Sequence, residues 1–183
     1  MPDLKRRYTV AEVLRFPEDG NRYELIRGAL VVSPAPMPRH QIVLGRLHGY
    51  LWNYLRELGR ADTLVGAPAD ISWDDETLVQ PDLLVVPPEE VTNSWTTYKT
   101  LLLAVEVLSP SSRRRDKIDK RDLYQERQVA AYWVVDHETG VVEVWEPNDQ
   151  RPLVVAETLT WRVTAAASDL AIQLSELFRG LPG

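Results

Sequence analysis

Two carboxylates interrupt apolar stretches of the sequence, and their surroundings suit metal-assisted chemistry. Asp82 begins the apolar run of QPDLLVV, and Glu106 stands near the end of LLLAVEVL, whose other residues are all apolar. Runs of this kind read as buried strands. A carboxylate in such a strand is costly unless a cation or hydrogen bonds compensate for the lost water. Two of them on neighbouring strands therefore indicate a shared cation.

The cation that fits two carboxylates is Mg²⁺ or Mn²⁺. Both suit oxygen ligands, and Mg²⁺ usually keeps several of its waters. Such a water has a lowered pKa and can act as the nucleophile in phosphodiester hydrolysis. Two simpler interpretations remain open at this stage. Asp82 could bind loop amides at the start of its strand, and Glu106 could form a buried salt bridge with an arginine.

A basic segment follows the Glu106 strand. It reads RRRDKIDKR at residues 113–121, with six basic and two acidic side chains. We expect it to open a helix of about 113–127 that Ser112 caps. The residues expected to hold phosphates are Arg113, Arg114, Arg115 and Arg121.

Lys120 is the residue of this helix with the clearest chemical role. Asp116 and Tyr124 lie one turn to either side of it on the same helix face. The lysine could reach Glu106, hold an attacking water or stabilise a phosphate in the transition state. The alternative is a surface pair between Lys120 and Asp116, which contributes little to stability.

The composition of the chain limits the classes of function. With 183 residues, 44% hydrophobic and 26% charged, it is predicted to form one globular domain over 1–183. The absence of cysteine excludes disulfides, a thiolate nucleophile and a cysteine zinc site. The net charge of −6 argues against a surface devoted to phosphates, although a local basic patch is compatible with nucleic acid. No stretch resembles a signal peptide or a membrane span, so we expect a cytoplasmic protein that contacts no membrane.

The spacing of apolar residues predicts the elements that must position these groups. Thr9 and Glu12 form a capping box for a short helix. The stretch RYELIRGALVVSP predicts a hairpin with its turn at Arg27-Gly28. Apolar residues at helical spacing over 39–58 predict a long helix that packs on a sheet.

The rest of the chain alternates between strands and loops, with two further helices. The run 101–108 must be a central strand, and Ser and Pro residues at 109–112 end it. Other strands are predicted at 64–65, 71–73, 78–86, 131–136, 141–145, 153–155 and 159–163, with a closing helix at 170–178. The fold class is α/β (α+β), a mixed sheet with helices on its faces.

Several motifs, taken together, resemble the Uma2 family. They are YELIRG, SPAPMPRH, QPDLLVV, VEVLSPSS, D-x3-K-x3-Y and AAYWVVD, and they cover roughly residues 9–144. Uma2 proteins are placed in the PD-(D/E)XK nuclease superfamily. The resemblance implies a restriction-endonuclease-like fold, with a mixed central sheet flanked by helices, and hydrolysis of DNA with Mg²⁺ or Mn²⁺.

The resemblance also implies which residues form the site. Pro81-Asp82 matches the PD of the superfamily, and Glu106 matches the acidic residue of the next strand; both are the implied metal ligands. The usual lysine two residues later is missing, because Leu108 stands there. Lys120 fits a lysine that has migrated to the helix, and Glu24 matches an extra acidic residue. Asp82, Glu106, Lys120 and Glu24 are thus the implied catalytic residues.

Two more residues are expected to assist at the site. His40 matches a histidine typical of the family and has no assigned role, and Tyr124 shares the helix face of Lys120. The alternatives are a structural hydrogen bond for His40 and an exposed strand carboxylate for Glu24. Arg27 and Gln128 depart from the family pattern, and both changes concern turns rather than chemistry.

Three hypotheses for function follow. The leading one is a Mg²⁺- or Mn²⁺-dependent endonuclease acting on DNA, favoured as a homodimer because cutting both strands takes two sites. The second is a nuclease-like fold kept as a binding or assembly module without turnover, favoured by the missing lysine and the acidic net charge. The third is a glycosidase with a carboxylate pair, which needs a broad cleft lined by aromatic residues.

Overall fold

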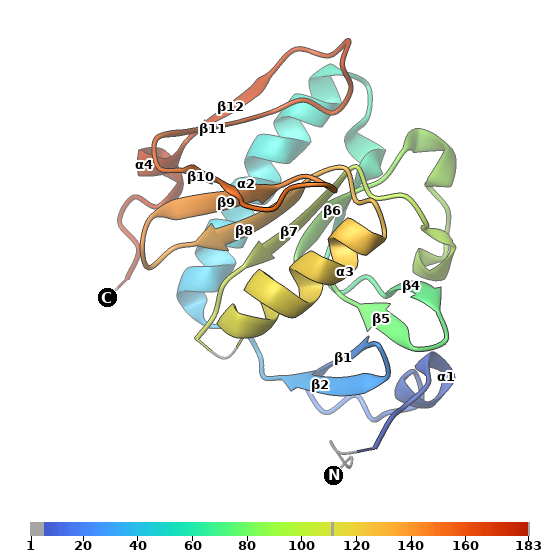
Figure 1. Cartoon of the computed structure of the whole chain (residues 1–183). Coiled ribbons are helices and arrows are strands. Elements are labelled where there is room, and N and C mark those ends of the chain that lie inside the picture. Colours follow the sequence, from blue (N-terminus) through green and yellow to red (C-terminus); the bar gives the residue numbers. More distant parts are fainter. Residues whose placement is uncertain (1–5, 111, 183) are drawn as a thin grey trace.

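A six-stranded mixed sheet forms the centre of the computed structural model, which describes residues 6–110 and 112–182 (Figure 1). Its strands are β3 (Leu64–Gly66), β6 (Leu83–Val85), β7 (Leu103–Val107), β8 (Tyr132–Asp136), β9 (Val141–Trp145) and β10 (Leu153–Val155). Their order is β10-β9-β8-β7-β6-β3, and only β7 and β8 run parallel. All five residues of β7 are buried, which confirms its predicted central place. Ser111, in the predicted break after this strand, lies outside the described residues.

Helices cover both faces of this sheet (Figure 1). The helices of the described residues are α2 (Pro38–Glu57), α3 (Arg121–Glu126), α4 (Leu174–Leu177) and α1 (Val10–Val13), the last of which packs on residues 22–30 and not on this sheet. A π-helical turn, η4 (Arg115–Lys120), leads into α3, and short 3₁₀ turns lie at Ala61–Thr63, Pro88–Glu90 and Trp95–Thr97. The long helix α2 lies on one face, and η4 with α3 lies on the other. Both predicted helices, 39–58 and 113–127, are therefore confirmed. Within the described ranges, no helix combines the length and the apolar character needed to cross a bilayer.

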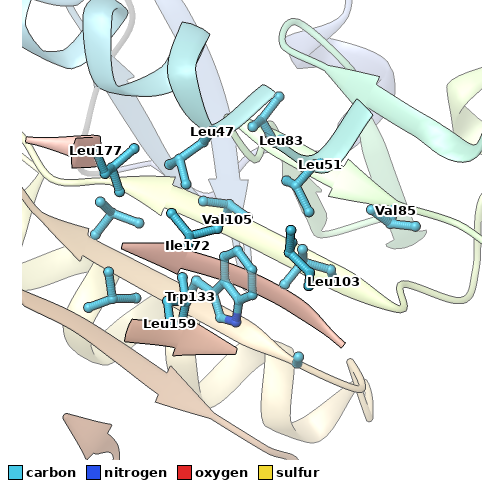
Figure 2. Close-up of a cluster of buried hydrophobic side chains, with 14 of the residues drawn as sticks. Leu47, Leu51, Leu83, Val85, Leu103, Val105, Trp133, Leu159, Ile172 and Leu177 are labelled. Atoms are coloured by element: carbon cyan, nitrogen blue, oxygen red, sulfur yellow. The ribbon is translucent and has the colours of Figure 1, made fainter. Parts of the chain in front are cut away.

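The face under α2 holds the larger hydrophobic core (Figure 2). Side chains spaced four residues apart in α2 are fully buried: Val43, Leu47, Leu51 and Leu55. They pack against the strand residues Leu83, Val85, Leu103, Val105 and Trp133. A hairpin of β11 (Thr158–Trp161) and β12 (Leu170–Gln173), followed by α4, adds Leu159, Ile172 and Leu177 to the same core. Each such leucine contributes about 1.5–3 kcal/mol when fully buried, so this face fixes α2 against the sheet.

A second sheet of four strands lies beside the first (Figure 1). Its order is β2-β1-β5-β4, with β1 (Arg22–Ile26), β2 (Ala29–Ser33), β4 (Ile71–Asp74) and β5 (Thr77–Val79). The β1–β2 turn is at Arg27 and Gly28, whose φ angles of 49° and 78° suit a tight hairpin. The amide of Thr9 donates to the Glu12 carboxylate at 2.9 Å, as a capping box requires. The predicted hairpin and N-terminal helix are confirmed.

Two predicted elements have other bounds in the structure. The run 78–86 is not one strand, because β5 belongs to the smaller sheet and β6 to the larger one. Pro81 stands between them and has no amide hydrogen to donate to a ladder. The closing helix predicted over 170–178 is shorter than expected: Leu174–Leu177 forms α4, whereas Leu170–Gln173 forms β12 and pairs with β11. In β12 buried and exposed residues alternate, which is the period of a strand.

Candidate active site at the junction of the two sheets

Asp82, directly before β6, lies across from Glu106 on the neighbouring antiparallel strand β7. Leu83 pairs with Val105, so the next pair along the same register is Asp82 with Glu106. The amide of Asp82 donates to the Val105 carbonyl at 3.0 Å, which extends the ladder to this pair. The two carboxylates are 1% and 2% exposed. Because like charges directly opposite each other destabilise a sheet, positive charge must lie close by.

Asp82 is surrounded by donors. Arg22 donates two hydrogen bonds to its Oδ1, both at 3.1 Å. His40 Nε2 lies 3.0 Å from Oδ2, and the amide of Val107 donates to the same oxygen at 2.9 Å. Burial alone would raise the pKa of Asp82, but the hydrogen bond and charge of His40, with Arg22 and the Val107 amide, lower it below its usual value. Asp82 is therefore held as a carboxylate.

Glu106 shares a buried lysine with Glu24. Lys120 Nζ lies 2.6 Å from Glu106 Oε1 and 2.7 Å from Glu24 Oε1. Tyr124 donates its hydroxyl to the same Glu106 oxygen at 3.3 Å. Burial raises the pKa of Glu106 well above its usual value; Lys120 opposes this rise, and the charge of Asp82 adds to it. The pKa values of the two carboxylates thus shift in opposite directions: Asp82 stays charged more readily, and Glu106 takes up a proton more readily.

Glu24 reaches this group from the smaller sheet. It lies on β1, and the amide of Gln80 donates to its Oε1 at 2.8 Å. Gln80 precedes Pro81 and Asp82 in the segment that joins β5 to β6. Glu24 Oε1 therefore contacts both the segment that joins β5 to β6, through the Gln80 amide, and the ammonium group of Lys120, at the place where the two sheets meet.

Asp116 is a further buried carboxylate beside Lys120. It lies on η4 and is 2% exposed. Its Oδ1 is 3.9 Å from Lys120 Nζ and 4.0 Å from Arg115 Nε, and it accepts no hydrogen bond from the described residues. Burial raises the pKa of Asp116, while the charge of Lys120 opposes this rise.

A cavity of about 320 Å³ brings these groups together. Its charged and titratable lining consists of Arg22, Glu24, His40, Asp82, Glu106, Arg115, Asp116 and Lys120. Four carboxylates thus face three permanent cations, with a histidine beside them. The described residues of the lining include no Trp, Tyr or Phe. The aromatic cleft that a glycosidase would need is therefore not found here.

Comparison with known proteins places this architecture in a family. The model of the Uma2 family, whose description reads "Putative restriction endonuclease", matches residues 10–175. The chain belongs to the Uma2 family. This confirms the resemblance seen in the sequence motifs and extends it toward the C-terminus.

A crystal structure described as "a putative nuclease belonging to DUF820 from Anabaena variabilis ATCC 29413" is similar to this Uma2 protein. Its TM-score is 0.77 at 20% sequence identity, and the match covers 95% of this chain and 99% of that chain. At this identity the likeness shows the fold, which confirms the predicted fold class. No curated protein matches the chain.

The four predicted phosphate-binding arginines of the Uma2 protein have different surroundings. Arg115 lines the cavity and donates to Ser33 Oγ at 2.9 Å. Arg113 instead binds Asp136 and Glu138, at 2.6 and 2.5 Å, and Arg114 is 79% exposed. Arg121 pairs with Asp122 and lies over the Trp145 ring. Only Arg115 of these four lies in the cavity lining.

Sequence reasoning missed two residues of this Uma2 site, Arg22 and Asp116. Arg22 stands two residues before Glu24 on β1, so the strand period places both on one face. Its guanidinium is attracted by Asp82, Glu106 and Glu24, which raise its pKa although burial opposes this. Asp116 precedes Lys120 by one helical turn, and it was read only as a surface partner of that lysine.

The oxygen donors of this site have the right chemistry for a hard divalent cation. Glu24, Asp82 and Glu106 offer carboxylates, which Mg²⁺ and Mn²⁺ prefer, and the excess of carboxylates over permanent cations leaves room for positive charge. In this conformation Arg22 and Lys120 contact the carboxylate oxygens of Asp82, Glu24 and Glu106. Within residues 6–110 and 112–182, no three acidic or histidine side chains are arranged as a metal cluster. The sequence predicts one cation shared by Asp82 and Glu106. In the part of the chain that the structure describes, no single side chain pairs with both: Arg22 pairs with Asp82, and Lys120 pairs with Glu106.

Proposed function

We propose that this Uma2 protein is a metal-dependent endonuclease that hydrolyses phosphodiester bonds of DNA. One observation carries the proposal. Glu24, Asp82, Glu106 and Lys120 come from four separate parts of the chain, are each at most 2% exposed, and line the same cavity. Burying four charged groups together is costly for stability, so their convergence favours a role in chemistry. The family description, a restriction endonuclease, supports the same reaction class.

Asp82 and Glu106 are the residues proposed to hold Mg²⁺ or Mn²⁺, with Glu24 assisting. When bound, the ion supplies an acidified water at neutral pH and neutralises charge on the phosphate. Asp82 is already a carboxylate, because its donors keep its pKa low. Glu106 gives up its proton when positive charge enters the cavity, since its raised pKa comes from burial and from neighbouring carboxylates.

Lys120 is proposed to act as a fixed positive charge. Burial alone would lower its pKa, but Glu106, Glu24 and Asp116 outweigh burial and raise it. The amine therefore stays protonated and cannot serve as a general base. It can donate hydrogen bonds to the attacking water or to a phosphate oxygen whose negative charge grows in the transition state.

Arg22 and Arg115 are proposed to bind the phosphate. Both guanidinium groups line the cavity, one from β1 and one from η4. A guanidinium matches the oxygens of a phosphate with two parallel donors. Arg115 is better placed to do so, because its Nε has no hydrogen-bond partner among the described residues, whereas Arg22 is engaged with Asp82.

Nicking of supercoiled plasmid in Mg²⁺ and in Mn²⁺ tests this function. We compare wild type with Asp82→Ala, Lys120→Ala and the control Lys117→Ala, whose side chain pairs with Glu143 outside the cavity. Loss of a transition-state donor costs roughly 10²–10³ in rate, so Lys120→Ala should fall by that factor and Lys117→Ala should match wild type. Equal residual nicking in all four proteins, or nicking that survives EDTA, would contradict the proposal.

One observation favours a second candidate, a binding or assembly module without turnover. Three carboxylates of the cavity already have partners within the chain: Arg22 and His40 contact Asp82, and Lys120 contacts Glu24 and Glu106. A site closed in this way needs no metal. Calorimetric titration with Mn²⁺ separates the two candidates, because a module without a metal site gives no heat that depends on Glu106.

A further inference from the structure

Lys120 occupies two of the oxygens proposed for the metal ion. Its ammonium group is within 2.7 Å of both Glu24 Oε1 and Glu106 Oε1. An ion cannot bind these oxygens while the ammonium holds them, because the two cations would repel each other at short range. Lys120 is 1% exposed, so it cannot simply swing into water. If an ion enters, the ammonium must find another buried acceptor.

Asp116 is such an acceptor, and its Oδ1 is not hydrogen-bonded in this conformation. Its buried Oδ1 accepts no hydrogen bond from the described residues, and it lies 3.9 Å from Lys120 Nζ. Normal hydrogen bonds join such atoms at about 2.8 Å, so a shift of roughly 1 Å would close the contact. A buried carboxylate oxygen without a hydrogen bond is costly. The cost is explained if the oxygen is bonded in another state of the site.

We propose that Asp116 is a positioning residue that receives Lys120 when a divalent cation takes Glu24 and Glu106. The inference rests on the proposed metal-dependent function. In this conformation the ammonium group of Lys120 bridges Glu24 and Glu106. With the ion present it pairs with Asp116, one turn away on the same helix, and it remains buried and charged. The lysine is thereby kept beside the ion, where its hydrogen bonds can reach the phosphate.

Arg115 is the competing partner for the same oxygen. Its Nε lies 4.0 Å from Asp116 Oδ1 and also has no hydrogen-bond partner among the described residues. If Arg115 were the true partner, Asp116 would affect cation binding whether or not Lys120 is present. If Lys120 is the partner, the effect of Asp116 must disappear when the lysine is removed. A double-mutant cycle separates the two cases.

The cycle is measured by calorimetric titration with Mn²⁺ alone. The proteins are wild type, Asp116→Asn, Lys120→Met and the double variant, with Asp119→Asn as the control on the exposed side of η4. We expect Asp116→Asn to weaken Mn²⁺ binding about tenfold and Asp119→Asn to change it less than about twofold. Lys120→Met should bind at least as tightly as wild type, because the competing ammonium is gone. The double variant should match Lys120→Met.

A second measurement does not depend on the Lys120→Met protein folding. The ¹⁵N-ammonium signal of Lys120 is followed by NMR in wild type, Asp116→Asn and Asp119→Asn while Mg²⁺ is added. The Lys120 signal should move to the same new position in wild type and in Asp119→Asn, and Asp116→Asn should not reach it. This signal reports the partner of the ammonium, which a merely structural role of Asp116 would leave unchanged.

Three results would overturn the inference. One is equal Mn²⁺ affinity for Asp116→Asn and Asp119→Asn. Another is a loss caused by Asp116→Asn that persists in the Lys120→Met background, which would assign the oxygen to Arg115. In both of these the metal still binds, so the proposed function stands. The third is the absence of Mn²⁺ heat in all five proteins, which would overturn the proposed function as well.

Discussion

Asp82 and Glu106 show how two carboxylates on one sheet face come to differ. Burial would raise the pKa of Asp82, but its hydrogen bonds with Arg22, His40 and the Val107 amide lower it below its usual value. Glu106 has one lysine and a tyrosine, and burial raises its pKa well above the usual range. Two titratable groups with pKa values driven apart are typical of sites that use them differently. Asp82 is suited to anchor a cation, and Glu106 to exchange a proton for it.

The raised pKa of Glu106 predicts how stability changes with pH. The folded protein keeps this proton at pH values where the unfolded chain, with an ordinary value near 4.5, has lost it. The stabilisation is therefore complete below that value and is lost as pH rises toward the folded pKa. Above pH 4.5 and up to the folded pKa of Glu106, the free energy of unfolding should fall by up to about 1.4 kcal/mol per pH unit relative to Glu106→Gln. Urea unfolding at several pH values measures this, and parallel pH profiles for the two proteins would contradict it.

Removal of the buried lysine should be costly. Lys120→Met leaves Glu24 and Glu106 without their shared cation, and breaking a buried pair costs about 3–5 kcal/mol. Lys117→Met is the matched control, because Lys117 is 30% exposed and pairs with Glu143; its loss should stay below about 1 kcal/mol. Urea unfolding at pH 7 compares them. A small and equal loss of unfolding free energy in Lys120→Met and Lys117→Met would mean that Glu24 and Glu106 are both protonated and need no lysine.

At the level of single residues, the sequence predicts much of the site. A carboxylate in an apolar run is a local signal, so Asp82 and Glu106 could be found from their neighbours. Lys120 was indicated by its place on the helix after the Glu106 strand, and Glu24 by the family resemblance. The structure places all four in one cavity; their roles remain predictions. Arg22 could not be found in this way, because nothing near it in the sequence shows that β1 will face Asp82.

The segment η4–α3 decides where the basic residues point. The sequence predicts a helix over 113–127, and the structure confirms it, but with a π-helical turn over its first part. A π turn contains an extra residue and is often found at functional sites. The apolar spacing does not reveal this turn, because it depends on which side chains the sheet and cavity bury. Here Asp116 and Lys120 are buried by it, while Ile118 between them is 40% exposed.

Deletion of Ile118 tests the π-helical turn. Removing one residue should convert the turn to regular α-helix, and it shortens the spacing of Asp116 and Lys120 from four residues to three. The two side chains could then no longer both keep their present positions in the cavity. We expect nearly unchanged helical circular dichroism but at least a tenfold loss of Mn²⁺ affinity, whereas Ile118→Ala should bind like wild type. Wild-type affinity in the deletion variant would show that the π turn is not needed.

The whole molecule places its site where two sheets meet. The larger sheet contributes Asp82 and Glu106, and the smaller one contributes Arg22 and Glu24. The sequence predicted one continuous strand through 78–86, because the apolar pattern hardly changes there. Only the three-dimensional structure shows that Gln80 and Pro81 lead from one sheet to the other. The completeness of the site therefore depends on the docking of the smaller sheet.

Two leucine-to-alanine changes that remove the same side-chain volume test whether the site depends on the docking of the smaller sheet. Leu78 in β5 pairs with Leu25, the neighbour of Glu24, and is 1% exposed; Leu177 in α4 is fully buried in the core under α2. Each Leu→Ala change should cost about 2–5 kcal/mol of stability. Local opening of the smaller sheet should follow only in Leu78→Ala, because stability is distributed unevenly over a fold. Mn²⁺ titration of both variants should show several-fold weaker binding for Leu78→Ala and wild-type binding for Leu177→Ala. Equal affinities would mean that Glu24 and Arg22 are not needed to hold the ion, and that the larger sheet alone forms the site.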